Sequence, residues 1–313
     1  MGNLCFGIDI GGTSVKLGIF TKEGELLDKW EIPTRKEEKG SFILKDVAAS
    51  LEKKIEEKSL KKEEIIGIGI GVPGPVREDG TVVQCVNLGW GTINVAREMK
   101  ALTGFDTKVG NDANVAALGE MWQGGGKGFK DLIMVTLGTG VGGGVILDGN
   151  IVTGSNGAAG EIGHITVSYD EPESCNCSKH GCLEQFASAT GIVKETKRML
   201  AGSSEPSSLR EAPELSAKAI FDAAKEGDAL ALRSVEQLGR YLGIALSHVA
   251  AVVDPEAFVI GGGVSKAGEM LTEVVKKHYE QNVMLALKGK VFKLAILEND
   301  AGIYGSAKLI LGK

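Results

Sequence analysis

Three cysteines and one histidine occur close together in the stretch "GHITVSYDEPESCNCSKHGC". Cys175, Cys177 and Cys182 lie within eight residues, and His164 lies eleven residues before the first of them. Three thiolates and one imidazole complete a tetrahedral Zn²⁺ site and leave no position open for a reacting water, so the pattern predicts a structural zinc that fixes a loop. Unrelated thiols are the alternative, but three of the five cysteines in one short polar loop favour the metal.

A flexible polar turn interrupts two apolar runs near the start of the chain, in "FGIDIGGTSVKLGIF" at residues 6–20. Gly11 and Gly12 leave backbone N–H groups accessible, and Thr13 adds a hydroxyl, a combination that suits phosphate. A Gly-Gly pair alone is more often an ordinary hairpin turn. Asp9 favours phosphate, because a carboxylate among apolar strand residues is costly to bury unless it has a partner such as Mg²⁺, held through water.

Two further glycine turns follow apolar segments. The segment "LIMVTLGTGVGGGVILD" at 132–148 repeats the order strand, polar glycine turn, strand, and we interpret it as a duplicated half; "FVIGGGVS" at 258–265 precedes a helical segment. Gly138, Gly140 and Gly143 match G-x-G-x-x-G, but a dinucleotide site needs a helix after the turn, whereas "VILD" indicates a strand. Together the three turns are similar to the phosphate and adenosine elements of actin-like ATPases and sugar kinases.

Asn111 and Asp112 fall where a short strand is expected to end and a helix to begin, in "DTKVGNDANVAALGEMW". A carboxylate at that position can cap the helix. It can also accept a proton from a substrate hydroxyl. The residues alone leave both interpretations open.

The elements that must position these residues alternate between strand and helix, which indicates an α/β protein. Segments 4–10 and 15–20 predict a hairpin, followed by a third strand near 26–32. Apolar residues recur every four positions in 41–58, which predicts an amphipathic helix with Ser41 as its N-cap. A long helix is expected over roughly 228–252.

Composition narrows the class of protein. The 313 residues are about twice the usual length of one domain, so two domains are expected. A net charge of -6 offers no basic field for nucleic acid, and no apolar stretch reaches the 18 or so residues of a membrane span. Five cysteines do not suggest a disulfide framework, so a reducing cytoplasm is expected. Cys5 and Cys85 lie in apolar, strand-like stretches and are predicted to be core thiols.

Seven motifs in order resemble the ROK family, which includes sugar kinases and repressors. They are "DIGGTSVK" at 9–16, "GVPGPV" at 71–76, "GNDANVAALGE" at 110–120, "LGTGVGGG" at 137–144, "GAAGEIGH" at 157–164, "CNCSKHGCLEQ" at 175–185 and "IGGGVS" at 260–265. The resemblance spans about residues 4 to 311 and is strongest to bacterial ROK glucokinases. The chain departs from the family's cysteine pattern only at Ser178, where glycine is usual, and this leaves the ligand count unchanged.

The resemblance implies a two-lobed actin-like ATPase fold, of the ribonuclease H-like kind, with a central cleft. The expected N-terminal small α/β lobe comprises residues 1–113 and 302–313. The expected C-terminal large α/β lobe comprises residues 114–301 and carries the zinc-binding loop.

The resemblance also implies roles for individual residues. Asp112 is the expected catalytic base for the sugar hydroxyl. The expected sugar-binding residues are Gly74, Asn111, Asp112, Glu161, His164 and Glu184. The residues expected to hold ATP and to place Mg²⁺ are Asp9, Gly11, Gly12, Thr13, Lys16, Gly138, Thr139, Gly140, Gly262 and Gly263.

The expected reaction is ATP-dependent phosphorylation of glucose at the 6-hydroxyl. Another hexose (N-acetylglucosamine, N-acetylmannosamine, fructose or allose) and a donor such as polyphosphate stay open as alternatives. A sugar-sensing repressor is less favoured, because such proteins carry an N-terminal helix-turn-helix, whereas the phosphate hairpin is expected here from residue 4. The family further implies a cytoplasmic homodimer or dimer of dimers, with no nucleic-acid or membrane partner.

Overall fold

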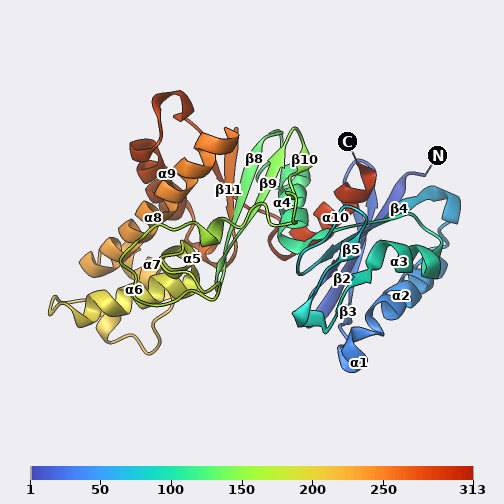
Figure 1. The fold of residues 1–313 in the computed structure, drawn as a ribbon, viewed down its shortest axis with the longest axis horizontal. Helices are drawn as coiled ribbons and strands as arrows, with labels where there is room; N and C mark the ends of the chain where they lie inside the picture. Colours follow the sequence, from blue (N-terminus) through green and yellow to red (C-terminus); the bar gives the residue numbers. More distant parts are fainter. Residues whose placement is uncertain (1, 313) are drawn as a thin grey trace. The chain divides into compact units, whose positions relative to one another are not determined.

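A computed structural model describes residues 2–312, which form two compact units (Figure 1). The first unit takes in the described parts of Met1–Lys130, Gly144–Ala159 and Leu297–Lys313; the second takes in Asp131–Gly143 and Gly160–Ile296. These bounds differ from the predicted lobe boundaries at residues 113 and 301, because helix α4 (Asp112–Gln123) packs along helix α10 (Ala301–Leu311) and so joins the first unit. The two lobes themselves stay a prediction.

A five-stranded sheet of order β3-β2-β1-β4-β7 forms the centre of the first unit. Its strands are β1 (Leu4–Ile10), β2 (Ser14–Thr21), β3 (Leu26–Pro33), β4 (Ile65–Val72) and β7 (Thr107–Asn111). The first three are antiparallel neighbours, as the predicted hairpin requires, whereas β4 and β7 run parallel to β1. Because β1, β4 and β7 are parallel, Asp9 and the residues that follow β4 and β7 all lie at the same edge of the sheet.

Helices cover both faces of this sheet. Alternate strand residues such as Phe6 and Ile8 pack with α2 (Ile43–Glu57) and α3 (Val95–Thr103). Cys5 and Phe20 point to the other face, where they pack with α10. The smaller elements of this unit are α1 (Glu37–Gly40), β5 (Thr81–Val82) and β6 (Ile93–Asn94). Cys5 and Cys85 are both buried, which confirms that these thiols belong to the core.

The second sheet has the order β10-β9-β8-β11-β12, and the unit boundary falls within β9. Its strands are β8 (Leu132–Leu137), β9 (Val141–Leu147), β10 (Asn150–Ile151), β11 (Ala257–Gly261) and β12 (Val291–Leu294). The helices of the second unit are α5 (Glu184–Ala187), α6 (Ala189–Ala201), α7 (Ala217–Lys225), α8 (Ala229–Val253) and α9 (Glu269–Asn282). If the strands of each sheet are numbered in chain order, both sheets have the order 3-2-1-4-5, as expected for a duplicated half.

Aromatic packing fixes α9 on the second sheet. Phe258 of β11 stacks on Phe292 of β12 at 5.0 Å and meets the edge of Tyr279 of α9 at 5.4 Å. Helix α8 lies beside α9 (Figure 1). The side chain of Asp228 caps α8 by accepting from two N–H groups of its first turn.

The predicted cap of α2 is wrong. Phe42 occupies the N-cap position and makes no side-chain cap hydrogen bond, while Ser41 is the C-cap residue of α1. The burial of Val47 and Leu51 against the sheet therefore stabilises this helix without a polar cap.

None of the helices within residues 2–312 has the length and hydropathy required of a transmembrane segment.

Candidate functional site

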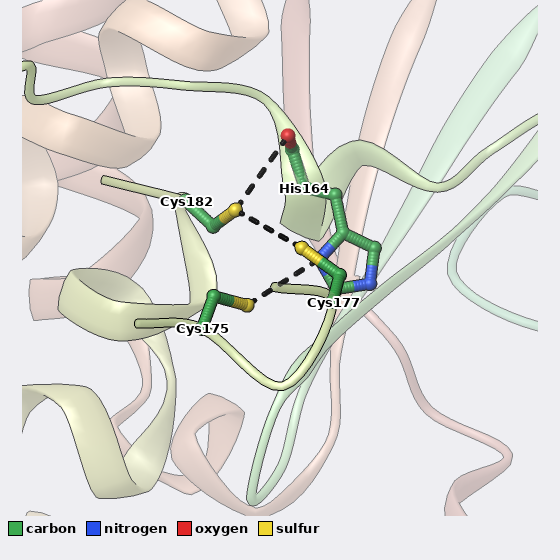
Figure 2. A group of neighbouring side chains, drawn as sticks. All are labelled: His164, Cys175, Cys177 and Cys182. Carbon is green, nitrogen blue, oxygen red and sulfur yellow. Dashed lines mark hydrogen bonds between the residues drawn. The ribbon is translucent and has the colours of Figure 1, made fainter. Parts of the chain in front are cut away.

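The four predicted metal ligands converge in the second unit (Figure 2). One imidazole nitrogen of His164 and the three cysteine sulfurs all lie within 4.8 Å of one another. Cys177 Sγ is 3.5 Å from Cys182 Sγ, and Cys175 Sγ is 3.7 Å from His164 Nδ1. In a tetrahedral zinc site with Zn–S bonds of about 2.3 Å, neighbouring sulfurs lie about 3.8 Å apart. The donor set therefore fits a closed tetrahedral metal site.

Burial disfavours the thiolate form of two of the three cysteines when no metal is bound. Burial raises the pKa of Cys175 to about 12 and also raises the pKa of Cys182. The backbone N–H of Lys179 instead lowers the pKa of Cys177. A metal binds thiolates, so loading the site releases protons and its affinity falls as the pH falls.

An ion pair between the buried Glu171 and the exposed Arg198 anchors the cysteine loop to α6. Arg198 on α6 donates from Nη1 to Glu171 Oε2 at 2.7 Å and from Nη2 to Glu171 Oε1 at 2.9 Å, a bidentate arrangement. The hydrogen bonds from Arg198 lower the pKa of Glu171 to about 2. Because Glu171 precedes Cys175 by only four residues, this pair holds the loop where the metal ligands meet.

Glu171→Gln is expected to lower the free energy of unfolding at pH 7 by about 1 kcal/mol, because the buried carboxylate that accepts charge-assisted hydrogen bonds from the exposed Arg198 is replaced by a neutral amide. The folded-state pKa lies below the unfolded value, so this stabilisation is present above about pH 4.5 and is lost as the pH falls toward 2. Urea unfolding of both proteins at pH 7 and pH 3 measures the difference. The matched control is Glu273→Gln, an exposed position on α9, and an equal loss in both variants would contradict the role of Glu171.

Glu184 connects the metal cluster with the second glycine turn. Cys175 Sγ donates to Glu184 Oε1 at 2.9 Å, and His164 Nδ1 lies 3.9 Å from the same oxygen. Cys175 and Glu184 line one pocket of about 640 Å³ together with Thr139 and Gly140. The structure therefore brings a predicted sugar-binding carboxylate, a metal ligand and a predicted phosphate turn to one place in the second unit.

The third glycine turn lies at the same edge of the second sheet. Gly262 follows β11 with a left-handed φ of +83°, and a Cβ there would stand 2.5 Å from Leu137 O at the end of β8. Glycine is thus required twice, for its backbone conformation and for this close approach. The approach places Gly262 beside the turn that begins at Gly138, while Gly263 faces open space.

The two ring nitrogens of His164 face different groups. Its Nδ1 faces the cysteine sulfurs, and its Nε2 lies 3.9 Å from Glu161 Oε2. Glu161 is exposed, so its carboxylate and the outer imidazole nitrogen are accessible to a ligand.

In the first unit, Asp9 lies one residue before the end of β1, beside the first glycine turn. Burial, and after it the Asp112 carboxylate, raise the pKa of Asp9 to about 6 against the opposing effect of Lys16. Lys16 and Asp112 are therefore each within electrostatic reach of Asp9. Gly11 N–H donates to Ser14 O at 2.9 Å, which closes the turn, and Lys16 Nζ donates to Asn299 O at 3.0 Å.

Asn111, and not Asp112, supplies the side-chain cap of α4. Asn111 Oδ1 accepts from the N–H groups of Ala113 at 3.1 Å and Asn114 at 3.2 Å, while its Nδ2 donates to Gly74 O at 3.1 Å. Asp112 is the first residue of the helix, and its Oδ1 accepts from Ala113 N–H at 2.8 Å. The interpretation of Asp112 as the helix cap is therefore wrong. Asn111 caps the helix and connects its first turn to Gly74.

Two contacts of the site were not predicted from the sequence. A Cβ at Gly302, in the first turn of α10, would lie 2.5 Å from Asp9 Oδ2, so only glycine leaves room for this carboxylate. Thr190 Oγ1 donates to Thr139 O at 2.6 Å and holds the second glycine turn. The contact of Gly302 with Asp9 is indicated in the sequence only by the glycine inside the apolar segment "AGIYGSAKLIL". The contact of Thr190 with Thr139 has no indication in the sequence.

Two mixed sheets of one strand order, each with glycine turns at the ends of its parallel strands, define an actin-like ATPase fold of the sugar kinase type. A model of the ROK family matches residues 5–313. The chain belongs to the ROK family.

Individual relatives are similar along nearly the whole chain. A glucokinase from Halalkalibacterium halodurans is 43% identical over 309 residues, which cover 97% of this chain and 94% of that protein. The crystal structure of a ROK family glucokinase from Streptomyces griseus, in complex with glucose and AMPPNP, matches with a TM-score of 0.73 and 32% identity over 97% of this chain and 98% of that one. A xylose repressor from Caldicellulosiruptor bescii is 30% identical and matches 92% of this chain and 74% of that protein.

Proposed function

We propose that this protein is an ATP-dependent glucokinase, which transfers the γ-phosphate of ATP to the 6-hydroxyl of glucose and yields glucose 6-phosphate and ADP. One observation carries the proposal. Within the first unit, Asp112 lies within electrostatic reach of Asp9 beside the glycine turn, at the edge where the parallel strands end. A candidate proton acceptor and a candidate phosphate-binding turn thus lie together, as phosphoryl transfer to an alcohol requires. The 43% identity to a named glucokinase supports glucose as the acceptor.

The proposed ATP-binding residues are the glycine turns and their neighbours. Backbone N–H groups of the turns bind the phosphates, and Lys16 adds positive charge. The full set is Gly11, Gly12, Thr13, Lys16, Gly138, Thr139, Gly140, Gly262 and Gly263. Asp9 is the residue that would hold Mg²⁺ through water; when bound, Mg²⁺ neutralises charge on the phosphates.

The proposed sugar-binding residues offer an amide, an imidazole, three carboxylates and a carbonyl, which match the donors and acceptors of a hexose. They are Gly74, Asn111, Asp112, Glu161, His164 and Glu184. Asp112 accepts the proton of the 6-hydroxyl while the oxygen bonds to the γ-phosphorus and the bond to ADP breaks. The turn that Asn111 caps keeps the Asp112 carboxylate in place, so its position counts more than its basicity.

The proposed metal in the cysteine cluster is a structural Zn²⁺ bound by His164, Cys175, Cys177 and Cys182. When bound, it fixes the loop that precedes Glu184 and orients His164, whose Nε2 is then directed to the sugar. The proposal also includes a homodimer or a dimer of dimers, which light scattering measures, and a cytoplasmic location, where ATP is available.

An ADP-release assay over a panel of hexoses tests the proposed substrate. We expect kcat/KM for glucose to exceed that for N-acetylglucosamine, N-acetylmannosamine, fructose and allose by at least about tenfold, because a polar shell built for one set of hydroxyls leaves groups unpaired with another. Reactions without sugar and with polyphosphate in place of ATP serve as controls. An acetamido sugar ranking above glucose would move the proposal to that substrate, and no turnover of any sugar would favour a sugar-sensing repressor.

A further inference from the structure

In two of the proposed phosphate-binding turns, a threonine hydroxyl donates to a backbone carbonyl of the turn. In the first unit, Thr34 Oγ1 donates to Gly11 O at 2.7 Å. In the second unit, Thr190 Oγ1 donates to Thr139 O at 2.6 Å. Neither threonine belongs to the proposed sugar-binding or phosphate-binding residues, so the repeated contact needs its own explanation.

The two hydroxyls come from different kinds of element. Thr34 directly follows β3, whereas Thr190 is the second residue of α6. The contact is therefore not a by-product of the strand order that the two sheets share. The same contact, made from unrelated positions, indicates that the turns themselves require it.

The contact in the first unit fixes the direction of one peptide group. A trans peptide group is planar, so its C=O and the N–H of the following residue point in opposite directions. Gly11 O is directed at the Thr34 hydroxyl. The N–H of Gly12 therefore points away from Thr34.

In the second unit, two successive peptide groups are fixed in the same way. Ala189 N–H, at the start of α6, donates to Gly138 O at 2.8 Å, so Thr139 N–H points away from that helix. The hydrogen bond from Thr190 to Thr139 O directs Gly140 N–H away from the helix as well. Successive N–H groups that point to one side form an arrangement that binds anions.

The N–H groups of Gly12, Thr139 and Gly140 are left for another acceptor. Among residues 2–312, none of the three donates to a backbone carbonyl. Thr139 is exposed, and the two glycines are half-buried. Backbone N–H groups in folded proteins nearly always have a partner, and phosphate oxygens are suitable ones.

The peptide groups need to be held because glycine permits them to turn over. Reversal of a peptide group in a turn carries the following residue to positive φ, as the difference between type I and type II turns shows. Glycine adopts that conformation at little cost, and the following residue is glycine in both turns, Gly12 and Gly140. The reversed group would present a carbonyl oxygen, which repels an anion, where the N–H now lies.

We propose that Thr34 and Thr190 are positioning residues that keep the N–H groups of Gly12 and Gly140 directed at the phosphates of ATP. The inference rests on the proposed function, because it takes both turns to bind phosphate. The two hydroxyls act only through the carbonyls that they contact. Their removal should therefore weaken the binding of ligands that carry phosphate and spare the binding of others.

Calorimetric titration of Thr34→Val and Thr190→Val tests the proposal. Valine keeps the branched shape of the side chain and removes the hydroxyl. Each variant should bind AMPPNP about tenfold more weakly than the parent, because one hydrogen bond to a charged group is misaligned. The Kd for adenosine, which has no phosphate, and the Kd for glucose should stay the same. Thr34→Ser and Thr190→Ser keep an Oγ and should restore the affinity for AMPPNP.

Thr103→Val in α3 and Thr272→Val in α9 are the matched controls. Each of these hydroxyls also donates to a backbone carbonyl, at 2.8 Å and 3.0 Å, but outside the turns. Both controls should bind AMPPNP as the parent does.

Each threonine is judged by its own variants. If the parent binds AMPPNP and a valine variant matches it, that threonine has no positioning role, while the proposed function stands. An equal loss of affinity for adenosine and glucose, or a serine variant as weak as the valine variant, also overturns the role, because the substitution then acts on the fold as a whole. A parent that binds no AMPPNP overturns the proposed function and the positioning role together.

Discussion

Asp112→Asn should lower kcat for glucose phosphorylation by about a thousandfold, while the Kd for glucose changes less than about threefold. The proposed base contributes in the transition state, where a positioned carboxylate that accepts a proton accounts for about a hundredfold to ten-thousandfold in rate. The amide keeps an oxygen that can accept from Ala113 N–H as Asp112 Oδ1 does, so the turn should keep its form. Steady-state kinetics and calorimetric titration with glucose measure the two quantities.

Asp106→Asn is the matched control, because Asp106 is an exposed carboxylate just before β7 that pairs only with Lys100 among the described side chains. Its kcat should stay near that of the parent. If Asp112→Asn retains near-normal turnover, Asp112 is not the base. A large rise in the Kd for glucose without a fall in kcat would instead assign Asp112 to sugar binding alone.

Removal of the proposed zinc from the cysteine cluster should lower the free energy of unfolding by about 4 kcal/mol and weaken glucose binding by about tenfold. Loss of a structural metal is among the few changes that destabilise a protein by this amount. The effect on glucose is expected because His164 belongs to the cluster, 3.7 Å from Cys175 Sγ, and Glu184 lies beside it, 2.9 Å from the same sulfur. Dialysis against a chelator, elemental analysis for zinc, thermal unfolding and glucose titration measure the outcome.

Cys177→Ser should reproduce the effects of chelation, whereas Cys85→Ser, a buried thiol outside the cluster, should keep the metal and the affinity for glucose. Unchanged glucose affinity after complete and proven metal loss would show that the cluster supports the fold alone. Retention of stoichiometric zinc by Cys177→Ser would contradict the assigned ligand set.

Much of this arrangement could be predicted because local chemistry determines it. The spacing of Cys175, Cys177 and Cys182 was sufficient to predict the metal cluster, and the glycine turns were predicted from strands that end in small residues. The alternation of strands and helices predicted an α/β protein and the second glycine hairpin predicted a duplicated half, whereas the two-lobed fold was implied by the family resemblance. Resemblance to the ROK family was needed for Glu161 and Glu184, since a lone glutamate is usually a solvated surface group.

The contacts that could not be predicted join residues far apart in the chain. Gly302 meets Asp9 across almost the entire sequence, and the Thr190 hydroxyl donates to Thr139 O across 51 residues. The cap at Ser41 was predicted from residue type alone, and the structure uses Phe42 because burial of the helix outweighs the cap. Such outcomes depend on packing, which no local pattern encodes.

The position of α10 has a consequence for folding. This helix covers Cys5 and Phe20 on one face of the first sheet and leaves room for the Asp9 carboxylate at Gly302. Because β1 and α10 are far apart along the sequence, the surroundings of Asp9 form only when these two segments meet. A contact between such distant segments costs chain entropy, so the turn beside Asp9 depends on the packing of the whole first unit and not on its own residues alone.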